Sequence, residues 1–476
     1  MRHPRDHTIT VRPSIHAPPQ PTRSACEAAV LLGTTIDPGP AIRAFSPLQI
    51  SLPPGTRAII QGPSGSGKST FVNHLRAALR AAEWRIISPP PAIRPTLPCL
   101  GAFGAGTPVP EAMRRLARAG LADLHALTAR AGTLSTGQRQ RLALAIAMHR
   151  AEASLARGTR TALIIDEFAS GLDPATAAGV AALLARFSAA CPALRIVVAS
   201  NHTHLTQWLR PTHEIRCSYG RAVPQIQTHL DPPAPIGDHP LQLFSIEQGS
   251  ASDLAPLAPE HYRPGRPATI SRVYRLSLRD PGAGSLPVGV LTLSQPTLNA
   301  TWRDLAWPGR YTALPKRAAA RRLNAEIRCI SRVIIDPRYR GLGLARALVS
   351  HALEHSETQG VEAVAAMGAA CPFFAAAGMT EYPLPRTERD ARLLDFLHEL
   401  NIEPWRLALP DAAFTRAMGT EPGALERELR RWANKSRATR ASRHEPATHL
   451  FRRACRSIAS EPRAYAWTRT TPGEPS

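Results

Sequence analysis

Residues 57–70 read RAIIQGPSGSGKST, and this stretch decides the fold of the N-terminal half of the chain. The apolar residues before the glycines predict a strand over 57–60, and the apolar spacing after them predicts a helix over 70–82. Between these elements, residues 62–69 fit the pattern G-x-x-x-x-G-K-[ST] in the strand–loop–helix setting that it requires. Backbone N–H groups of such a loop surround phosphate oxygens at a helix N-terminus. The predicted ATP-binding residues here are Gly62, Pro63, Ser64, Gly65, Ser66, Gly67, Lys68, Ser69 and Thr70.

The basic residues of the chain point to the same loop. Only three of the 58 basic side chains are lysines, namely Lys68, Lys316 and Lys435. A bias that replaces lysine by arginine wherever arginine serves makes each remaining lysine informative. Lys68 stands where ATP chemistry needs a compact charge on a flexible stem, a role that the wide guanidinium of arginine does not suit. Ser69 follows it and offers its hydroxyl to Mg²⁺.

Further motifs follow this loop in order. Residues 134–138 (LSTGQ) open a helix predicted over 137–150. The strand predicted over 162–165 ends in Asp166, which suits Mg²⁺ through water, and Glu167, which can polarise an attacking water. The sequence SGLD occupies 170–173, and a strand predicted over 196–199 is followed by His202.

The set of motifs resembles the ATP-binding-cassette (ABC) ATPases, whose signature is L-S-G-G-Q, over about residues 28–225. The resemblance implies ATP and Mg²⁺ as ligands, with Ser69 and Asp166 at the metal. It makes Glu167 the catalytic base and His202 the switch histidine, for which His204 is a weaker candidate. It also implies a head-to-tail homodimer that sandwiches ATP between the phosphate loop of one subunit and the signature of the other. The residues that would reach the ATP of the other subunit are Ser135, Thr136, Gly137, Gln138 and Asp173.

Two departures from this family concern transport. No glutamine occurs between Asn73 and the signature, so the Q-loop of the family has no candidate. The segment between Thr70 and Leu134, where transporters carry the helical subdomain that couples to a permease, is short and proline-rich. We therefore expect ATP binding without coupling to a permease.

A second glycine loop lies in the C-terminal half. Residues 338–345 (RYRGLGLA) follow a strand predicted over 327–335 and open a helix predicted over 344–356. A hairpin of strands is predicted before this unit over 273–278 and 288–293, and another strand after it over 361–366. Glycine N–H groups at a helix N-terminus, flanked by arginines, again suit a pyrophosphate.

This order of elements resembles the GCN5-related N-acetyltransferase (GNAT) fold, whose acetyl-CoA turn reads [QR]-x-x-G-x-[GA] and whose later helix commonly reads F-[YF]-x-x-x-G-[FM]. The resemblance implies acetyl-CoA as a ligand. Glu326 is the best candidate for the base that deprotonates the amine, with a solvated strand-end charge as the competing interpretation. Phe373 and Phe374 stand where many members have a tyrosine acid, and nearby Cys371 is interpreted as a buried thiol. The residues implied to bind acetyl-CoA are Val333, Ile335, Arg338, Arg340, Gly341, Gly343, Leu344 and Ala345.

The predicted fold class is α/β, with an ABC-type P-loop ATPase domain, then an α+β GNAT-fold domain and a helical, basic C-terminal tail. The predicted boundaries are 1–27 for a poorly ordered segment, 28–230 for the ATPase, 231–267 for a linker, 268–385 for the acetyltransferase-like domain and 386–476 for the tail. Within the first segment a short strand is expected over 8–11. The tail is expected to be helical around 393–400 and 423–432 and to fray after that. Short strands are expected over 28–52. No uncharged apolar run is long enough to cross a membrane and no hydrophobic signal core opens the chain, so we expect a cytoplasmic protein.

The net charge of +22 is uneven, since residues 46–230 carry 20 basic and 8 acidic side chains. RNA or DNA is the obvious polyanionic partner, and a solvated surface in an arginine-rich protein is the competing interpretation. The leading hypothesis is an ATP-hydrolysing domain coupled to an acetyl-CoA-dependent N-acetyltransferase that acts on, or while bound to, nucleic acid. The alternatives are an acetyltransferase for a protein or small-molecule amine regulated by the ATPase, a non-catalytic acetyl-CoA-sensing switch, and, least favoured, a transporter subunit.

Overall fold

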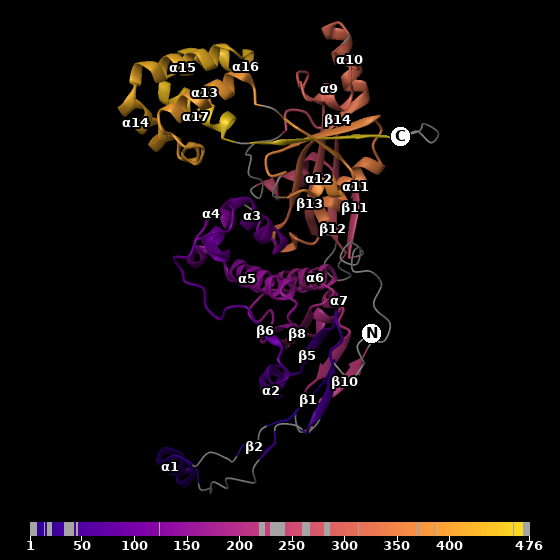
Figure 1. Cartoon of the computed structure of the whole chain (residues 1–476). Coiled ribbons are helices and arrows are strands. Elements are labelled where there is room, and N and C mark those ends of the chain that lie inside the picture. Colours follow the sequence, from indigo (N-terminus) through magenta and orange to yellow (C-terminus); the bar gives the residue numbers. More distant parts are fainter. Residues whose placement is uncertain are drawn as a thin grey trace.

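The computed structural model describes residues 7–13, 15–16, 21–32, 42–43, 46–122, 124–218, 224–228, 243–258, 267–279, 286–312, 314–368, 371–384, 386–459 and 461–469. Figure 1 shows an N-terminal unit built on one sheet, a second sheet stacked above it, and a group of helices beside the second sheet. Residues 1–6 of the segment predicted to be poorly ordered lie outside these ranges.

The N-terminal sheet has six strands. All of its neighbouring pairs are parallel except β10 and β9 at one edge, which are antiparallel. Its strands in spatial order are β10 (Gln225–Thr228), β9 (His213–Arg216), β5 (Arg57–Gln61), β8 (Arg195–Ser200), β7 (Thr161–Ile165) and β6 (Arg85–Ile87). The central strands are buried at every residue, as expected of parallel strands covered on both faces. The α/β prediction for this half is confirmed.

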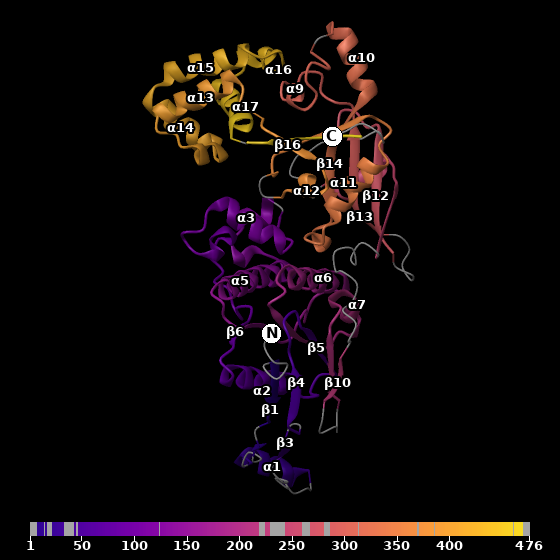
Figure 2. The same ribbon diagram turned by 45° about the vertical axis from the view of Figure 1, so that its right-hand side comes forward.

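Helices cover both faces of this sheet. On one face, α2 (Lys68–Ala81) packs Phe71 and Leu75 against Ile60 of β5. On the other face, α5 (Thr136–Ala156) and α6 (Pro174–Ala190) pack against Ile59. Figure 2 shows α5 and α6 lying between the two sheets. A helical segment with α3 (Val109–Arg118) and α4 (Leu124–Thr128) precedes α5, and α7 (Thr206–Leu209) follows β8.

The N-terminal boundary differs from its prediction. The short strand expected over 8–11 is present as β1 (Thr8–Val11) and pairs with β4 (Leu48–Ser51), while β2 (Ile15–His16) pairs with β3 (Ile42–Arg43). The chain therefore begins to pair with the ATPase unit before residue 28. The expectation of strands from residue 28 is wrong at its start, because α1 (Arg23–Leu31) is a helix that Thr22 caps by accepting a hydrogen bond from the N–H of Ala25 at 3.3 Å.

The second sheet is antiparallel except for one central parallel pair, β14 and β15. Its strands in spatial order are β11 (Phe244–Gln248), β12 (Arg272–Leu278), β13 (Leu286–Ser294), β14 (Ile327–Ile335), β15 (Gly360–Ala365), β17 (Arg463–Thr468) and β16 (Thr380–Tyr382). The helices of this unit are α9 (Arg303–Ala306), α10 (Lys316–Glu326), α11 (Leu344–Glu354) and α12 (Phe373–Ala376).

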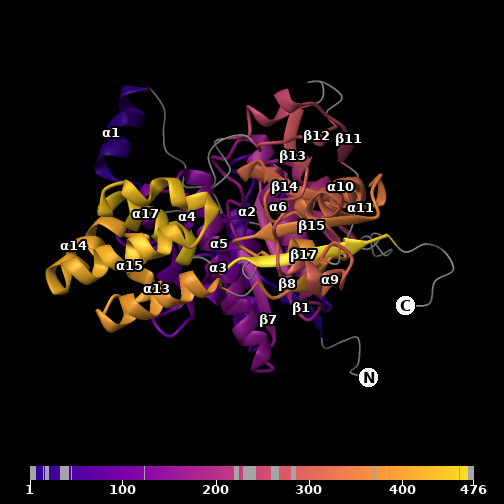
Figure 3. The ribbon, with the colours of Figure 1, turned by 90° about the horizontal axis from the view of Figure 1, so that it is seen from above.

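This sheet extends beyond the predicted boundaries of 268–385 in both directions. The strand β11 lies in the predicted linker, and β17 lies in the predicted tail, where it inserts between β15 and β16. Figure 3 shows β17 beside β15. The tail prediction missed β17 because its pairing partner, β15, lies about a hundred residues earlier in the chain. Residues 386–459 are therefore an insertion between the last two strands of the sheet rather than a terminal extension.

The insertion is an ordered helical unit. Its helices are α13 (Glu388–Glu399), α14 (Pro410–Thr420), α15 (Pro422–Asn434), α16 (Arg437–Arg440) and α17 (Ala447–Ile458). They bury a core of their own that includes Leu397, Trp432 and Phe451. The helices expected around 393–400 and 423–432 are present, whereas α16, α17 and β17 stand where fraying was expected among the described residues.

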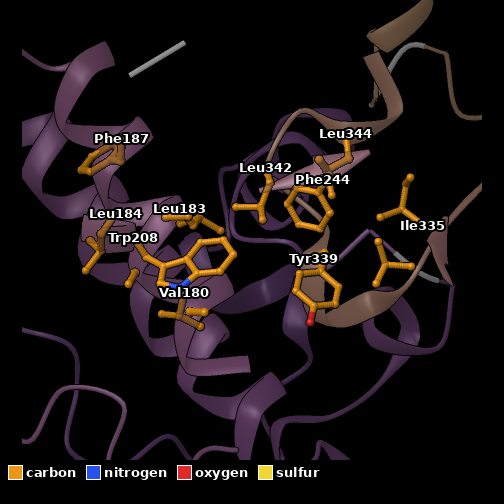
Figure 4. Close-up of a cluster of buried hydrophobic side chains, with 14 of the residues drawn as sticks. Val180, Leu183, Leu184, Phe187, Trp208, Phe244, Ile335, Tyr339, Leu342 and Leu344 are labelled. Atoms are coloured by element: carbon orange, nitrogen blue, oxygen red, sulfur yellow. The ribbon is translucent and has the colours of Figure 1, made fainter. Parts of the chain in front are cut away.

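The two sheet units share one hydrophobic core. Figure 4 shows Leu183 and Trp208 of the first unit facing Phe244, Tyr339 and Leu342 of the second. The ring of Phe244 makes edge contacts with Trp208 at 6.5 Å and with Tyr339 at 5.6 Å between centroids. Burial of this much apolar surface fixes the two units against each other. Among the described helices, none is both long and apolar enough to cross a membrane.

Candidate functional site

The first glycine loop lies between β5 and α2 and has the geometry of an anion cradle. Gly67 is the residue before α2 and has a φ of +87°, a conformation that favours glycine. No side chain caps this helix start, and its first turn holds no acidic residue. A Cβ on Gly62 would lie 2.2 Å from the carbonyl oxygen of Cys217. The loop therefore leaves the first N–H groups of α2 to a ligand, as a phosphate site requires.

Lys68 and Ser66 both fit a phosphate ligand. The Nζ of Lys68 donates to the carbonyl oxygens of Gly62 at 2.7 Å and Pro63 at 2.8 Å, so the ammonium lies folded into the loop. The Oγ of Ser66 is buried and has no hydrogen-bond partner among the described residues. Since a buried hydroxyl without a partner is costly, this atom is positioned for a ligand. The residues of the loop thus fit ATP with Mg²⁺.

The carboxylates and the histidine reach the same edge of the sheet as this loop. The sheet order β5-β8-β7 places the segment after β8, with His202, between the glycine loop and Asp166–Glu167. The N–H of Glu167 donates to Oδ1 of Asp166 at 3.0 Å, and Glu167 has a φ of +50°, which is uncommon for a residue other than glycine. Such backbone strain persists where the surroundings impose it, often at functional sites.

Gln61 supports this arrangement and was not singled out from the sequence. Its Nε2 donates to the carbonyl oxygen of His202 at 3.3 Å and to Oγ1 of Thr206 at 3.2 Å. The N–H of His202 donates to Oγ of Ser200 at 3.2 Å. The last residue of β5 therefore ties the histidine segment to the phosphate loop, a contact that only the parallel pairing of β5 and β8 brings about.

The signature residues (134–138) and the SGLD segment (170–173), which is the D-loop of the ABC family, lie at the starts of α5 and α6 and line one cavity. Ser135 caps α5 through a reciprocal pair of hydrogen bonds with Gln138, at 3.3 and 3.0 Å. Asp173 caps α6 by accepting from the N–H groups of Ala175 and Thr176, both at 3.1 Å. Burial alone would raise the pKa of Asp173, but hydrogen bonds from Thr176 and the charge of Arg338 hold it below its usual value.

The second glycine loop repeats the first in outline. Gly343 is the residue before α11, and Gly341 and Gly343 both have a φ of +84°. No side chain caps α11, and its first turn holds no acidic residue. Next to the loop, β14 and β15 pair only as far as Ile330 and Ala363, after which β14 runs on to Ile335. Backbone groups of 331–335 thus lie beside a gap in the sheet, where an extended ligand can pair with them.

A cavity of about 560 Å³ connects the loop with this gap. Seven of the eight residues predicted to bind acetyl-CoA line it, namely Val333, Ile335, Arg340, Gly341, Gly343, Leu344 and Ala345. Cys371 lines it too, and burial raises the pKa of its thiol, which keeps it protonated. The glycine loop and the gap in the sheet, joined by this cavity, therefore fit a ligand that has a pyrophosphate and a long thin arm.

Arg338 lies elsewhere. Its guanidinium pairs with Asp336 at 2.7 Å, and the residue lines a separate cavity of about 340 Å³ together with the signature and D-loop residues. The structure thus brings seven predicted residues together and places the eighth in the cavity beside the signature.

Glu326 is held in a network of ion pairs at the end of α10. Its carboxylate accepts from Nε of Arg310 at 2.7 Å, from Nε of Arg322 at 3.0 Å and from the hydroxyl of Tyr311 at 3.0 Å. Although burial works in the opposite direction, these donors lower the pKa of Glu326 to about 2. A carboxylate of such low basicity accepts a proton poorly at neutral pH, so these contacts favour a structural role.

Two polar side chains near the gap, Ser331 and Tyr465, were not predicted from the sequence. The pairing register of β13 and β14 shifts at Ser331, whose Oγ lies 2.7 Å from that of Ser294. Bulges of this kind occur next to active sites. Tyr465 of β17 lies opposite Ala363, and burial raises its pKa to about 12, so its hydroxyl stays protonated. No local signal could have found either residue, because both depend on strand pairing.

A third cavity is larger, at about 1170 Å³, and no residue lining it also lines the cavity at the second glycine loop. It lies between the second sheet unit and the helical insertion, and its wall includes Trp302, Tyr311 and Asp390.

Comparisons with known proteins agree with these geometries. Residues 317–379 match the family model for the Acetyltransferase (GNAT) family. Part of the chain is 29% identical over 217 residues to the lipoprotein-releasing system ATP-binding protein LolD of Pseudomonas fluorescens, a match covering 38% of this chain and 91% of that protein. A shorter match, 38% identical over 146 residues, is to the zinc import ATP-binding protein ZnuC of Ruegeria pomeroyi, covering 28% of this chain and 53% of that protein.

Solved structures also align with part of the chain. The ATP-binding cassette MJ0796, in a dimeric post-hydrolysis state bound to ADP and Pi, is 20% identical with a TM-score of 0.31, covering 40% of this chain and 92% of its own. The cbiO1 protein of Clostridium perfringens, part of the ABC transporter complex cbiONQ, is 19% identical with a TM-score of 0.30, covering 40% of this chain and 83% of its own.

The motifs, the sheet order and the sequence relatives together define the class of protein. The N-terminal part of the chain is an ABC ATPase cassette, and the later part carries an acetyltransferase domain of the GNAT family.

Proposed function

We propose that this protein hydrolyses ATP at its first site and, at its second, transfers an acetyl group from acetyl-CoA to an amine. Closure of an ATP-bound homodimer controls the transfer, and the protein acts on, or while bound to, nucleic acid. The observation that carries the proposal is the direct contact between α5, the helix that follows the signature, and the second glycine loop (residues 338–345), which we call the acetyl-CoA loop.

That contact is made by Arg141, three residues after Gln138. Arg141 is 3% exposed and donates to the carbonyl oxygens of Arg338 and, at 3.4 Å, Arg340. Burial and the nearby charge of Arg340 lower its pKa to about 10. Glycines make this approach possible, since a Cβ on Gly120 would lie 2.0 Å from Nη1 of Arg141. Movement of the signature helix on dimer closure would therefore be transmitted to the acetyl-CoA loop.

At the first site, Ser69 and Asp166 hold Mg²⁺ and Glu167 polarises the attacking water. Mg²⁺ supplies charge neutralisation between the phosphates when it is bound. His202, tied to β5 through Gln61, senses the outer phosphate. Ser135 and Thr136 are exposed at the start of α5, as surfaces that meet the ATP of a second subunit must be.

At the second site, backbone groups of Val333 and Ile335 orient the pantetheine arm, and the loop before α11 holds the pyrophosphate. Acetyl-CoA would supply the thioester: the amine attacks its carbonyl carbon, the C–N bond forms as the C–S bond breaks, and coenzyme A leaves as a thiolate that is protonated by solvent. Glu326 is the base candidate that the sequence indicates. Because its contacts favour a structural role, we propose that water in the cavity takes the amine proton instead.

The proposal of a nucleic-acid partner rests on charge. The excess of basic over acidic side chains is largest in residues 46–230, whereas residues 231–385 carry 16 basic and 13 acidic side chains. A polyanion bound along the ATPase unit would be presented to the acetyltransferase site. The tRNA wobble-cytidine acetyltransferase, which also joins a nucleotide-driven motor to a GNAT domain, offers an analogy of function only.

Two measurements test this function. The first is binding of RNA and DNA as a function of salt, where absence of affinity at about 50 mM salt contradicts a nucleic-acid partner. The second is mass spectrometry of RNA and protein fractions after incubation with labelled acetyl-CoA, with and without ATP. Label in protein or a small amine favours the regulated-enzyme alternative, while acetyl-CoA binding without any transfer favours the sensing switch. Co-purification with a permease would favour the transporter alternative.

A further inference from the structure

The acetyl-CoA cavity has a second wall, and the ATPase unit provides it. Arg114 and Arg118 of α3 and Arg186 of α6 line the same cavity as Arg340 and Arg346 of the acetyltransferase unit. Figure 1 shows α3 and α6 facing the side of the second sheet unit that carries α11 and α12. The cavity is therefore a property of the joined units.

Arg186 lies directly against the glycine loop. Its Nη1 donates to the carbonyl oxygen of Gly341 at 3.0 Å. A Cβ on Gly343 would lie 2.6 Å from the same nitrogen. The guanidinium thus lies within van der Waals distance of the backbone that begins α11, where a pyrophosphate would bind.

Positive charge is concentrated in this cavity. Five arginines line it, and none of its lining residues within the described ranges is acidic. Arg118 forms an ion pair with Glu152, with 2.7 Å between Nη1 and Oε1. Burial and the nearby charge of Arg346 lower the pKa of Arg186. Like charges held this close cost free energy, which an anionic ligand would recover through charge-assisted hydrogen bonds.

The remaining lining matches the rest of the same ligand. Met367, Pro372 and Phe373 give the cavity an apolar side next to the gap between β14 and β15. An acyl-CoA combines a pantetheine arm, whose methylene and methyl groups can contact apolar side chains and whose amides can pair with a strand edge, with a pyrophosphate and a 3′-phosphate. Its chemistry therefore matches both halves of the cavity.

We propose that the ATPase unit forms part of the acyl-CoA site, with Arg186, Arg114 and Arg118 binding the phosphates of coenzyme A. This inference rests on the proposed acetyl-CoA-dependent function and adds residues that no acetyltransferase motif contains. The site is complete only while α3 and α6 face the glycine loop. Coenzyme A is thereby a ligand of both units at once.

The test measures binding of coenzyme A to the full chain by calorimetry. Pantetheine, which lacks the phosphates, is the comparison ligand, and its binding is measured by NMR. Arg186→Gln and Arg114→Gln are each expected to weaken coenzyme A binding by about 10-fold to 100-fold, the range for loss of a hydrogen bond to a charged group. Pantetheine binding should stay within about 2-fold. Arg157→Gln, an exposed arginine at the end of α5, is the matched control and should change neither.

The outcomes separate this inference from the function on which it rests. If the wild-type chain does not bind coenzyme A, the proposed function fails. If it binds and both variants bind like the control, or if the variants lose coenzyme A and pantetheine equally, the inference fails while the function stands. Arg114 is exposed and makes no ion pair among the described residues, so Arg114→Gln reports on charge even if Arg186→Gln disturbs the packing of the two units.

Discussion

The two glycine loops of this protein have nearly the same backbone and different sources of charge. Each follows a strand and begins a helix, with Gly67 at a φ of +87° and Gly343 at +84°. The first loop carries its own cation, Lys68, folded onto the carbonyl oxygens of Gly62 and Pro63. The second has no lysine, and Arg186, from a helix about 155 residues earlier, donates to its Gly341.

This difference shows two ways to complete an anion site. Backbone N–H groups at a helix start provide direction, but binding of a multiply charged phosphate also needs cations nearby. A loop that contains its lysine works wherever the strand and helix form. The second loop contributes Arg340 to its cavity and takes Arg186 from the other unit. Its full set of cations is therefore assembled only when the two units are packed together, so its affinity is open to control by whatever moves them.

The largest expected effects concern the first loop and its carboxylate. Glu167→Gln should reduce ATP hydrolysis by about 10²-fold to 10⁴-fold while ATP affinity changes little, because only proton transfer is removed. Lys68→Met should instead abolish ATP binding. Steady-state phosphate release measures ATP hydrolysis, and an equilibrium nucleotide-binding assay measures ATP affinity. Hydrolysis by the Glu167 variant at the wild-type rate would refute its assignment.

Alanine at the two capping glycines compares the loops directly. Both positions have positive φ, so each Cβ disfavours the native conformation of its loop by about 1–2 kcal/mol, a factor of about 5 to 30 in the population of that conformation. A Cβ on Gly67 meets nothing within 4 Å, whereas one on Gly343 meets Arg186 at 2.6 Å. Gly343→Ala should therefore weaken coenzyme A binding more than Gly67→Ala weakens ATP binding. Equal losses by calorimetry would argue that Arg186 plays no part in the second site.

Arg141→Met tests the link between the loops. It leaves the carbonyl oxygens of Arg338 and Arg340 without this buried donor, at a cost of about 1–3 kcal/mol in the free energy of unfolding. We also expect coenzyme A affinity to lose any dependence on ATP. Arg150→Met, an exposed position in the same helix, is the control for both readouts. Retention of ATP dependence in the Arg141 variant would exclude this residue as the route of coupling.

The smallest effect is expected at Glu326. Its pKa of about 2 lies below the ordinary value of 4.5, so its contribution to stability is fully present above about pH 4.5 and is lost as the pH falls towards 2. Allowing for solvent screening of its partly exposed arginines, Glu326→Gln should cost about 1 kcal/mol at neutral pH and nothing near pH 2. The rate of acetyl transfer should change less than about 3-fold. A loss beyond 100-fold would restore Glu326 as the base.

Local elements were predictable, and non-local ones were not. The strand predicted over 327–335 has the same bounds as β14, and the strand predicted over 57–60 differs from β5 by one residue. In contrast, β11 and β17 were assigned to a linker and a tail. Edge strands and returning strands are stabilised by partners far away in the sequence, so their own residues carry a weak signal.

The candidate sites divide in the same way. The sequence by itself determined the phosphate loop, its lysine, the carboxylates and the second glycine turn, because each depends on residue types at fixed short spacings within one strand–loop–helix unit. Only the tertiary structure decided that Arg338 turns toward the signature, that Glu326 is held by three donors, and that Arg141 and Arg186 meet the second loop. Those contacts join residues over long separations, and they form because burial of the apolar surface around Phe244 and Tyr339 holds the two units together.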